Sequence, residues 1–272
     1  MVKYMEVNNK LIKNNRSESL RLNYNEVKER VRIFSEGFED TGFKLPENYC
    51  QMTDEEYDKI RDFTLSKSKE LAKTYPDSSL NPNLDGEQGL IAHIDWMTKL
   101  LERLWQYDKF RSLFPKGTNF AFLKFLALVH DYSRFIFNGP FPLTYVDWVG
   151  DALVERRFFP GIPFDRYLHS IRYITGEKEP PDPQENPLPY IFKALDSLGK
   201  PGRDPEKFLN EDYDQWLKRQ VELGRFPIKV RRHGKIVKVT ALEYKERDIG
   251  MIREGLRVIE DIVGGEIGRI FG

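Results

Sequence analysis

Apolar residues recur with a helical period over long stretches of the chain. Within residues 88–108, one face of the predicted helix carries Leu90, Ile94, Met97, Leu101 and Leu104. Residues 119–130 are apolar almost all round, which indicates a helix at the centre of the core. Further helices are predicted over residues 21–38, 146–158, 163–174, 190–198 and 205–223. The pattern therefore favours an all-α fold.

Two capping boxes mark the starts of helices, because each has a hydroxyl residue followed three positions later by a glutamate. Thr53 and Glu56 predict a helix that continues to about residue 73. Thr240 and Glu243 predict a closing helix that continues to about residue 262.

The period changes near the C-terminus. In the stretch PIKVRRHGKIVKVT, β-branched residues stand on both sides of His233-Gly234, which predicts a small β-hairpin. Residues 175–189 contain five prolines and predict an irregular loop, long enough for a lid or a spacer. We expect an N-terminal extension (residues 1–50), a helical core (51–225), and a hairpin with a C-terminal helix that packs on the core (226–272).

Composition narrows the class of protein. The 43 basic and 43 acidic side chains cancel, which disfavours nucleic acid as the main partner. A single cysteine excludes a disulfide within the chain and favours a reducing compartment. No apolar run is long enough for a signal peptide or a membrane span. We therefore expect a cytoplasmic protein without a membrane partner.

Candidate metal ligands lie in segments that otherwise look like core. His93 belongs to the amphipathic helix, His130 and Asp131 end the apolar helix, and Asp196 has apolar helical neighbours. Taken singly, a core histidine is usually hydrogen-bonded, and a helical aspartate is a cap or a surface group. Together they indicate a divalent cation, because a buried carboxylate is costly unless it is paired or bound to a metal.

The order His, His-Asp, Asp resembles the HD-domain superfamily of metal-dependent phosphohydrolases. From His93 to His130 is 37 positions, and from Asp131 to Asp196 is 65. The stretch LALVHDYSR is similar to that family's apolar helix and His-Asp pair, with Arg134 where a basic residue is common. FKALDSLG is similar to its final, aspartate-bearing helix. The resemblance covers about residues 53–223 and implies an HD-type helical bundle.

The resemblance implies hydrolysis of a phosphate ester of a small molecule, with a nucleotide as the first expectation. One divalent ion (Mn, Fe, Co, Ni, Zn or Mg) would be held by His93, His130, Asp131 and Asp196. Asp131 could also orient or deprotonate the attacking water. The ion would acidify that water and polarise the phosphoryl group.

Three further residues receive roles from their positions near these ligands. Arg134 and Arg172 could clamp a phosphate, and the alternative for Arg134 is a surface salt bridge. His169 is either a general acid/base near the leaving group or a buried structural group. Two-metal branches of the family usually carry more than one extra histidine, so the lone His169 favours a single ion.

Other functions stay open. A ligand-sensing or scaffold protein of HD type would keep the metal with little turnover, and the flanking segments could serve a partner or a homo-oligomer. A di-iron oxygenase of this fold would need more ligands. The acidic pair of alarmone hydrolases is absent after Asp131, as is the glycine- and histidine-rich continuation of deoxynucleotide triphosphohydrolases.

Overall fold

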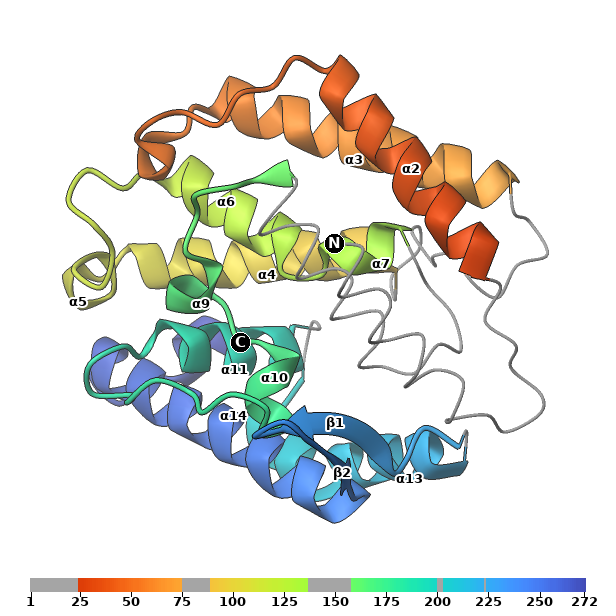
Figure 1. Cartoon of the computed structure of the whole chain (residues 1–272). Coiled ribbons are helices and arrows are strands. Elements are labelled where there is room, and N and C mark those ends of the chain that lie inside the picture. Colours follow the sequence, from red (N-terminus) through yellow and green to blue (C-terminus); the bar gives the residue numbers. More distant parts are fainter. Residues whose placement is uncertain (1–23, 75–88, 137–157, 200–202, 223) are drawn as a thin grey trace.

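The computed structural model describes residues 24–74, 89–136, 158–199, 203–222 and 224–272. This part of the chain is mostly helical, with one two-stranded antiparallel sheet and a closing C-terminal helix, as the sequence predicts (Figure 1). The first half contains α2 (Tyr24–Asp40), the 3₁₀ turn η1 (Tyr49–Gln51), α3 (Asp54–Thr74), α4 (Leu90–Trp105), α5 (Asp108–Arg111), α6 (Phe120–Val129) and α7 (Tyr132–Ile136).

The second half is built from shorter helices, the sheet and one long helix. Its elements are α9 (Phe164–Tyr167), α10 (Ile171–Ile174), α11 (Leu188–Leu198), α12 (Pro205–Lys207), the π-helical turn η3 (Phe208–Asp212), α13 (Tyr213–Glu222), β1 (Ile228–Arg232), β2 (Lys235–Val239), α14 (Ala241–Val263) and α15 (Gly268–Phe271). No helix among the described residues is both long enough and apolar enough to cross a membrane.

Helix α6 lies at the centre of the core, as its uniformly apolar sequence predicts. From Ala121 to Val129 every residue except Lys124 is buried. Helices α3 and α4 pack on α6, and α2 crosses α3 and α7 on the outside. Lys124 points outward, where its ammonium pairs with Asp54 and lies over the ring of Tyr57. The central position of α6 fixes its C-terminal end, which carries His130.

Helix α2 shares this core through aromatic side chains. Phe34 makes edge-on ring contacts with Phe63 of α3, with Tyr132 of α7 and with Phe158. The buried Arg30 donates a hydrogen bond to the carbonyl of Ile136 at 3.1 Å. Part of the segment interpreted as an N-terminal extension therefore contributes to the main core.

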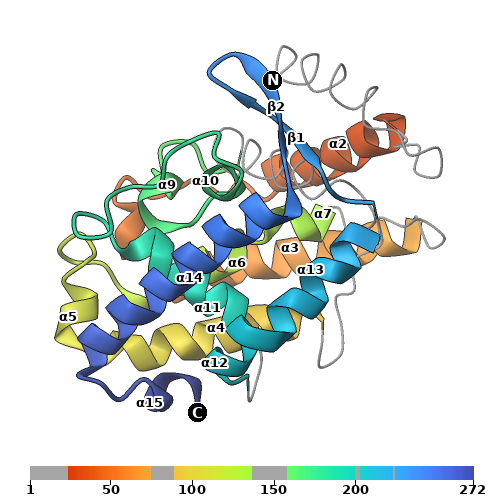
Figure 2. The same ribbon diagram turned by 90° about the horizontal axis from the view of Figure 1, so that it is seen from below.

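The predicted hairpin and closing helix are confirmed. Strands β1 and β2 pair antiparallel, and the turn residues His233 and Gly234 have φ angles of 48° and 78°. Helix α14 begins at the Thr240–Glu243 capping box and packs along α11. Figure 2 shows α14 lying beside α11, with the hairpin extending from its N-terminal end.

One predicted helix is wrong and another cannot be compared. Residues 163–174 form two short helices, α9 and α10, instead of one. The break occurs because Leu168 is extended and the Ser170 side chain caps the backbone N–H of Arg172. Most of the predicted helix over residues 146–158 lies outside the described residues.

Candidate metal centre

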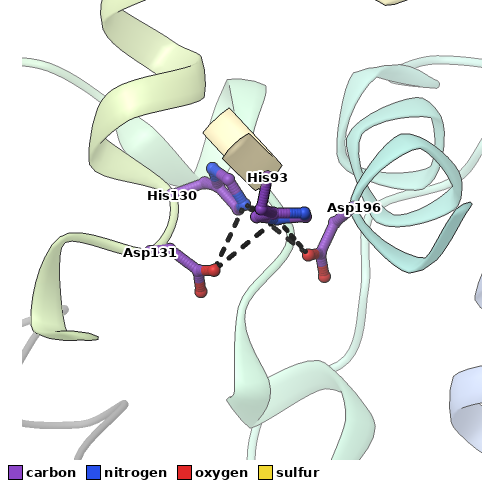
Figure 3. Close-up of side chains that lie close together, drawn as sticks. All are labelled: His93, His130, Asp131 and Asp196. Atoms are coloured by element: carbon purple, nitrogen blue, oxygen red, sulfur yellow. Dashed lines mark hydrogen bonds and ion pairs between the residues drawn. The ribbon is translucent and has the colours of Figure 1, made fainter. Parts of the chain in front are cut away.

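Four side chains from three helical segments converge at one point (Figure 3). His93 comes from α4, His130 and Asp131 follow the end of α6, and Asp196 comes from α11. The Nε2 atom of His93 lies 3.2 Å from Nε2 of His130 and 3.3 Å from Oδ1 of Asp196. The Oδ2 atom of Asp131 lies 3.6 Å from His93 Nε2 and 3.7 Å from His130 Nε2. One nitrogen or oxygen from each residue lies within 4.8 Å of all the others.

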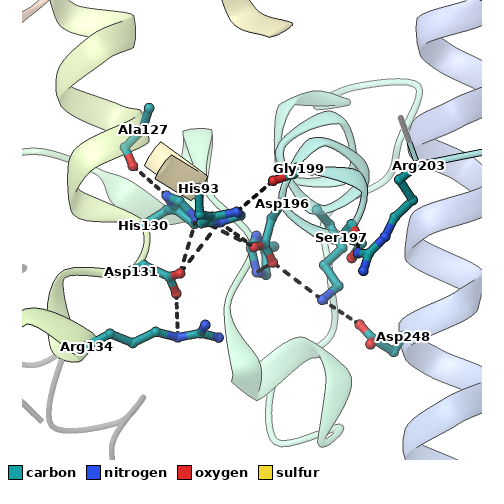
Figure 4. A network of polar contacts seen from close by, with 12 residues as sticks. His93, Ala127, His130, Asp131, Arg134, Asp196, Ser197, Gly199, Arg203 and Asp248 are labelled. Carbon is teal, nitrogen blue, oxygen red and sulfur yellow. Dashed lines mark hydrogen bonds and ion pairs between the residues drawn. The ribbon is translucent and has the colours of Figure 1, made fainter. Parts of the chain in front are cut away.

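Two backbone carbonyls orient the imidazole rings (Figure 4). Nδ1 of His93 lies 3.1 Å from the carbonyl oxygen of Gly199, and Nδ1 of His130 lies 2.6 Å from that of Ala127. Because a carbonyl oxygen only accepts hydrogen bonds, each Nδ1 must carry its proton. In the neutral rings both Nε2 lone pairs therefore point at the convergence point, as in histidines that bind metals.

A cation at the point of convergence would offset the negative charges of the two carboxylates. Oδ2 of Asp131 is buried and has no hydrogen-bond partner among the described residues. Two carboxylate oxygens and two nitrogen lone pairs would repel one another unless a proton or a metal ion lay between them. In the metal-free chain this role falls to a proton, since burial would lower the pKa of His93 but Asp196 and Asp131 together raise it.

The second carboxylate is held ionised by its surroundings. Burial acts to raise the pKa of Asp196, but the contacts with His130 at 3.6 Å and His93 at 3.3 Å and the charge of Lys193 keep that pKa well below its ordinary value. About 18% of the Asp196 side chain and 16% of the His93 side chain are exposed, against 1% for His130. Solvent therefore reaches part of the cluster, on the side of Asp196 and His93.

Gly199 allows the close approach of His93 to α11. A Cβ atom at position 199 would lie 2.9 Å from Cε1 of His93 and 3.0 Å from its Nδ1. Gly199 also caps the C-terminal end of α11. The contact of Gly199 with the His93 ring could not be predicted from the neighbouring sequence.

The structure also places the other predicted site residues. Nε of Arg134 lies 3.0 Å from Oδ1 of Asp131, and about half of its side chain is exposed. Among the described residues, no ion pair joins Arg172 on α10 to the cluster. His233 is exposed in the hairpin turn. The phosphate-binding roles of Arg134 and Arg172 stay predictions.

The break between α9 and α10 brings His169 to the edge of the cluster. Its Nε2 lies 3.5 Å from Oδ2 of Asp196, while its buried Nδ1 finds no partner within the described ranges. Burial, together with the nearby charge of Lys193, lowers the pKa of His169 to about 3. The ring is therefore neutral at physiological pH and touches the oxygen of Asp196 that faces away from His93.

Lys193 and Asp248 are the residues near this centre that the sequence analysis missed. Lys193 stands one helical turn before Asp196 on α11 and is buried. Its ammonium lies 3.8 Å from Oδ2 of Asp196 and 2.9 Å from Oδ1 of Asp248 on α14. A lysine in the apolar stretch YIFKALDSL was an available signal, but its partner lies far away in sequence.

Two nitrogen and two oxygen ligands suit Mn, Fe, Co, Ni or Zn, and Mg less readily. The four residues could hold such an ion. Comparisons of the chain with protein-family models, with curated proteins and with solved structures found no match. The case for a function therefore rests on the site itself.

Metal binding should strengthen as the pH rises. The raised pKa of His93 means that its Nε2 carries a proton over part of the range above the ordinary imidazole value of about 6.5, and a metal must displace that proton. Asp196, with its lowered pKa, is already ionised there. The Kd for Mn²⁺, measured by titration calorimetry between about pH 6 and pH 8, is expected to fall with pH, with proton release on binding. A Kd independent of pH over this range would contradict the protonated state of His93.

Proposed function

We propose that the chain is a metal-dependent phosphohydrolase of HD type, which uses one divalent ion to hydrolyse a phosphate ester of a small molecule. The observation that carries the proposal is the convergence of His93, His130, Asp131 and Asp196, in the order typical of the HD-domain superfamily. The buried Asp131 oxygen without a hydrogen-bond partner supports a bound cation. A nucleotide is the first substrate to test.

Different residues of the chain would bind the ion, orient Asp131 and attract the phosphate. A divalent ion held by the four ligands would supply Lewis acidity toward a phosphoryl oxygen and a water molecule. Asp131 combines two contacts, with Oδ2 facing the imidazoles and Oδ1 facing Arg134, so its orientation is fixed from both sides. The exposed half of Arg134 lies beside the centre, where a guanidinium would attract a phosphate.

Metal analysis and a substrate screen test this proposal together. The purified chain is expected to bind one equivalent of Mn²⁺, Fe²⁺, Co²⁺, Ni²⁺, Zn²⁺ or Mg²⁺. The loaded protein should release phosphate or a nucleoside from a panel of nucleotides and phosphodiesters. Addition of EDTA should stop turnover, and re-addition of the metal should restore it. Failure to bind any of these ions would refute the proposal.

The same experiment separates the alternatives left open by the sequence. Binding of one ion without turnover on the whole panel would favour a ligand-sensing or scaffold protein. Two irons per chain would favour an oxygenase and would contradict a single-ion centre.

A further inference from the structure

A buried chain of polar contacts joins the C-terminal helix to the metal centre. The Tyr213 hydroxyl on α13 donates a hydrogen bond to Oδ2 of Asp248 at 2.7 Å. The other oxygen of Asp248 lies 2.9 Å from the Lys193 ammonium, which in turn faces Asp196. Lys193, Asp248 and Tyr213 are each at most 7% exposed. Figure 4 shows Asp248 reaching toward this network from α14, on the side of Asp196 away from Asp131.

These contacts keep Lys193 charged. Burial would lower the pKa of Lys193, but Asp248 and Asp196 more than offset that effect and raise it. Burial raises the pKa of Tyr213, so its hydroxyl stays protonated and donates. The ammonium group, 2.9 Å from Asp248 and 3.8 Å from Asp196, therefore lies on the outer side of Asp196.

Stability alone does not explain a buried ion pair in this position. Desolvation of two charges roughly cancels their attraction, and apolar residues of similar size are often as stable. The pair also lies against a proposed ligand rather than in an unrelated part of the core. Its location therefore favours a role at the centre.

The ammonium group lies on the side of Asp196 opposite the point where the four candidate ligands converge. Oδ1 of Asp196 faces the convergence point of the four ligands, and Oδ2 faces away from it. Around that outer oxygen lie the Lys193 ammonium at 3.8 Å and His169 Nε2 at 3.5 Å, with Asp248 on the far side of Lys193. Without Lys193, the buried position that its ammonium now fills would lie between two carboxylates, those of Asp196 and Asp248.

The geometry points to Lys193, clamped by Asp248 and Tyr213, as the positioning residue that fixes Asp196 and takes the place of a second metal ion. The inference deepens the proposed function, since it concerns the same centre, and it predicts that the centre binds one ion only. It also makes α14 part of the metal site, although that helix contributes no ligand of its own.

Mn²⁺ binding by three variants tests the inference without any substrate. Wild type and Lys245→Met are expected to bind one Mn²⁺ per chain. Lys245 is the matched control, because it also pairs with an aspartate across α13 and α14 but at the surface. Lys193→Met is expected to bind a second, weaker Mn²⁺, detected by titration calorimetry and by spin coupling between the two ions. Thermal melts of the metal-free proteins check that each variant is folded.

Lys193→Met alone leaves the buried Asp248 carboxylate without its ion-pair partner, which could unfold the protein. The double variant Lys193→Met/Asp248→Asn avoids this problem. It removes both charges, so the net charge near Asp196 is unchanged and only the positioning is lost. The Kd of the first Mn²⁺ is expected to rise by about 10–100-fold, as for other groups that orient metal ligands.

Three results would overturn the inference: two ions in wild type, a single ion in folded Lys193→Met, or an unchanged Kd in the double variant. These outcomes are independent of the proposed reaction. A protein that binds one Mn²⁺ and behaves as expected in the variants, yet hydrolyses nothing, would refute the phosphohydrolase and leave the role of Lys193 standing.

Discussion

Asp131→Asn is expected to abolish metal binding and, with it, turnover. The substitution preserves the shape of the side chain but removes a negative charge, and the buried Oδ2 position becomes part of a neutral amide. Loss of groups that only orient a ligand lowers metal affinity by about 10–100-fold, so loss of a ligand charge should exceed about 100-fold. His130→Ala, which removes a ring that is 1% exposed, should have the same effect.

Thermal unfolding measures this effect without a substrate. At a metal concentration of about 100 times Kd, wild type should gain about 2.7 kcal/mol, or roughly 5–10 °C in Tm. Asp131→Asn should show no shift in Tm on addition of Mn²⁺. The control is His233→Asn, which changes an exposed histidine and tolerates the positive φ at that position. An unchanged metal response in folded Asp131→Asn would contradict the proposed ligand set.

Patterns among neighbouring residues were sufficient to predict much of the fold. The Thr53–Glu56 and Thr240–Glu243 boxes predicted two helix starts that the structure confirms. The uniformly apolar residues before His130 predicted the buried α6. These features depend on neighbouring residues, whose physical consequences are fixed by helix geometry alone.

The four candidate ligands could be predicted because each is a polar residue placed where an apolar one is expected. The structure brings these four residues together, although the distances between them could not be predicted from the sequence: His93, His130, Asp131 and Asp196. The contacts that orient them could not be predicted in the same way. The carbonyls of Gly199 and Ala127 are backbone groups, and every residue has one.

One predicted helix was wrong and one buried residue was missed, for different physical reasons. Apolar spacing over residues 163–174 predicted one helix, but the Ser170 cap starts a new helix there. His169 lies in the break between the two helices, close to Asp196. The role of Lys193 depends on Asp248, which arrives from another helix. The first outcome depends on a cap two residues away, which apolar spacing does not detect, and the second depends on a residue 55 positions away in sequence.

Gly255→Ala is expected to be the most destabilising single-methyl change in α14. A Cβ atom at position 255 would lie 2.1 Å from the carbonyl oxygen of Tyr190 and 2.9 Å from Cβ of Ala194. Both neighbours belong to α11, and a backbone carbonyl cannot rotate away as a flexible side chain can. The two helices must separate, which should lower the free energy of unfolding by about 3 kcal/mol, in the range of overpacked cores.

Gly250→Ala provides the matched control on the same helix. Gly250 is exposed, and no atom lies within 4 Å of the Cβ position. Alanine there should stabilise the chain by about 0.5–1 kcal/mol, because it restricts the unfolded backbone and favours the helix. Urea unfolding of both variants should therefore give opposite signs, and equal stabilities would contradict the close contact of α14 with α11.

The Gly255→Ala variant also tests whether the packing of α14 on α11 affects metal affinity. Helix α11 carries Asp196 and Lys193, and α14 carries Asp248, so separation of the two helices must lengthen the 2.9 Å contact between Lys193 and Asp248. In the fraction of Gly255→Ala that remains folded, the Kd for Mn²⁺ should rise by about 10-fold or more, whereas Gly250→Ala should bind as wild type does. A destabilised Gly255→Ala with unchanged metal affinity would show that α14 supports the fold without positioning the centre.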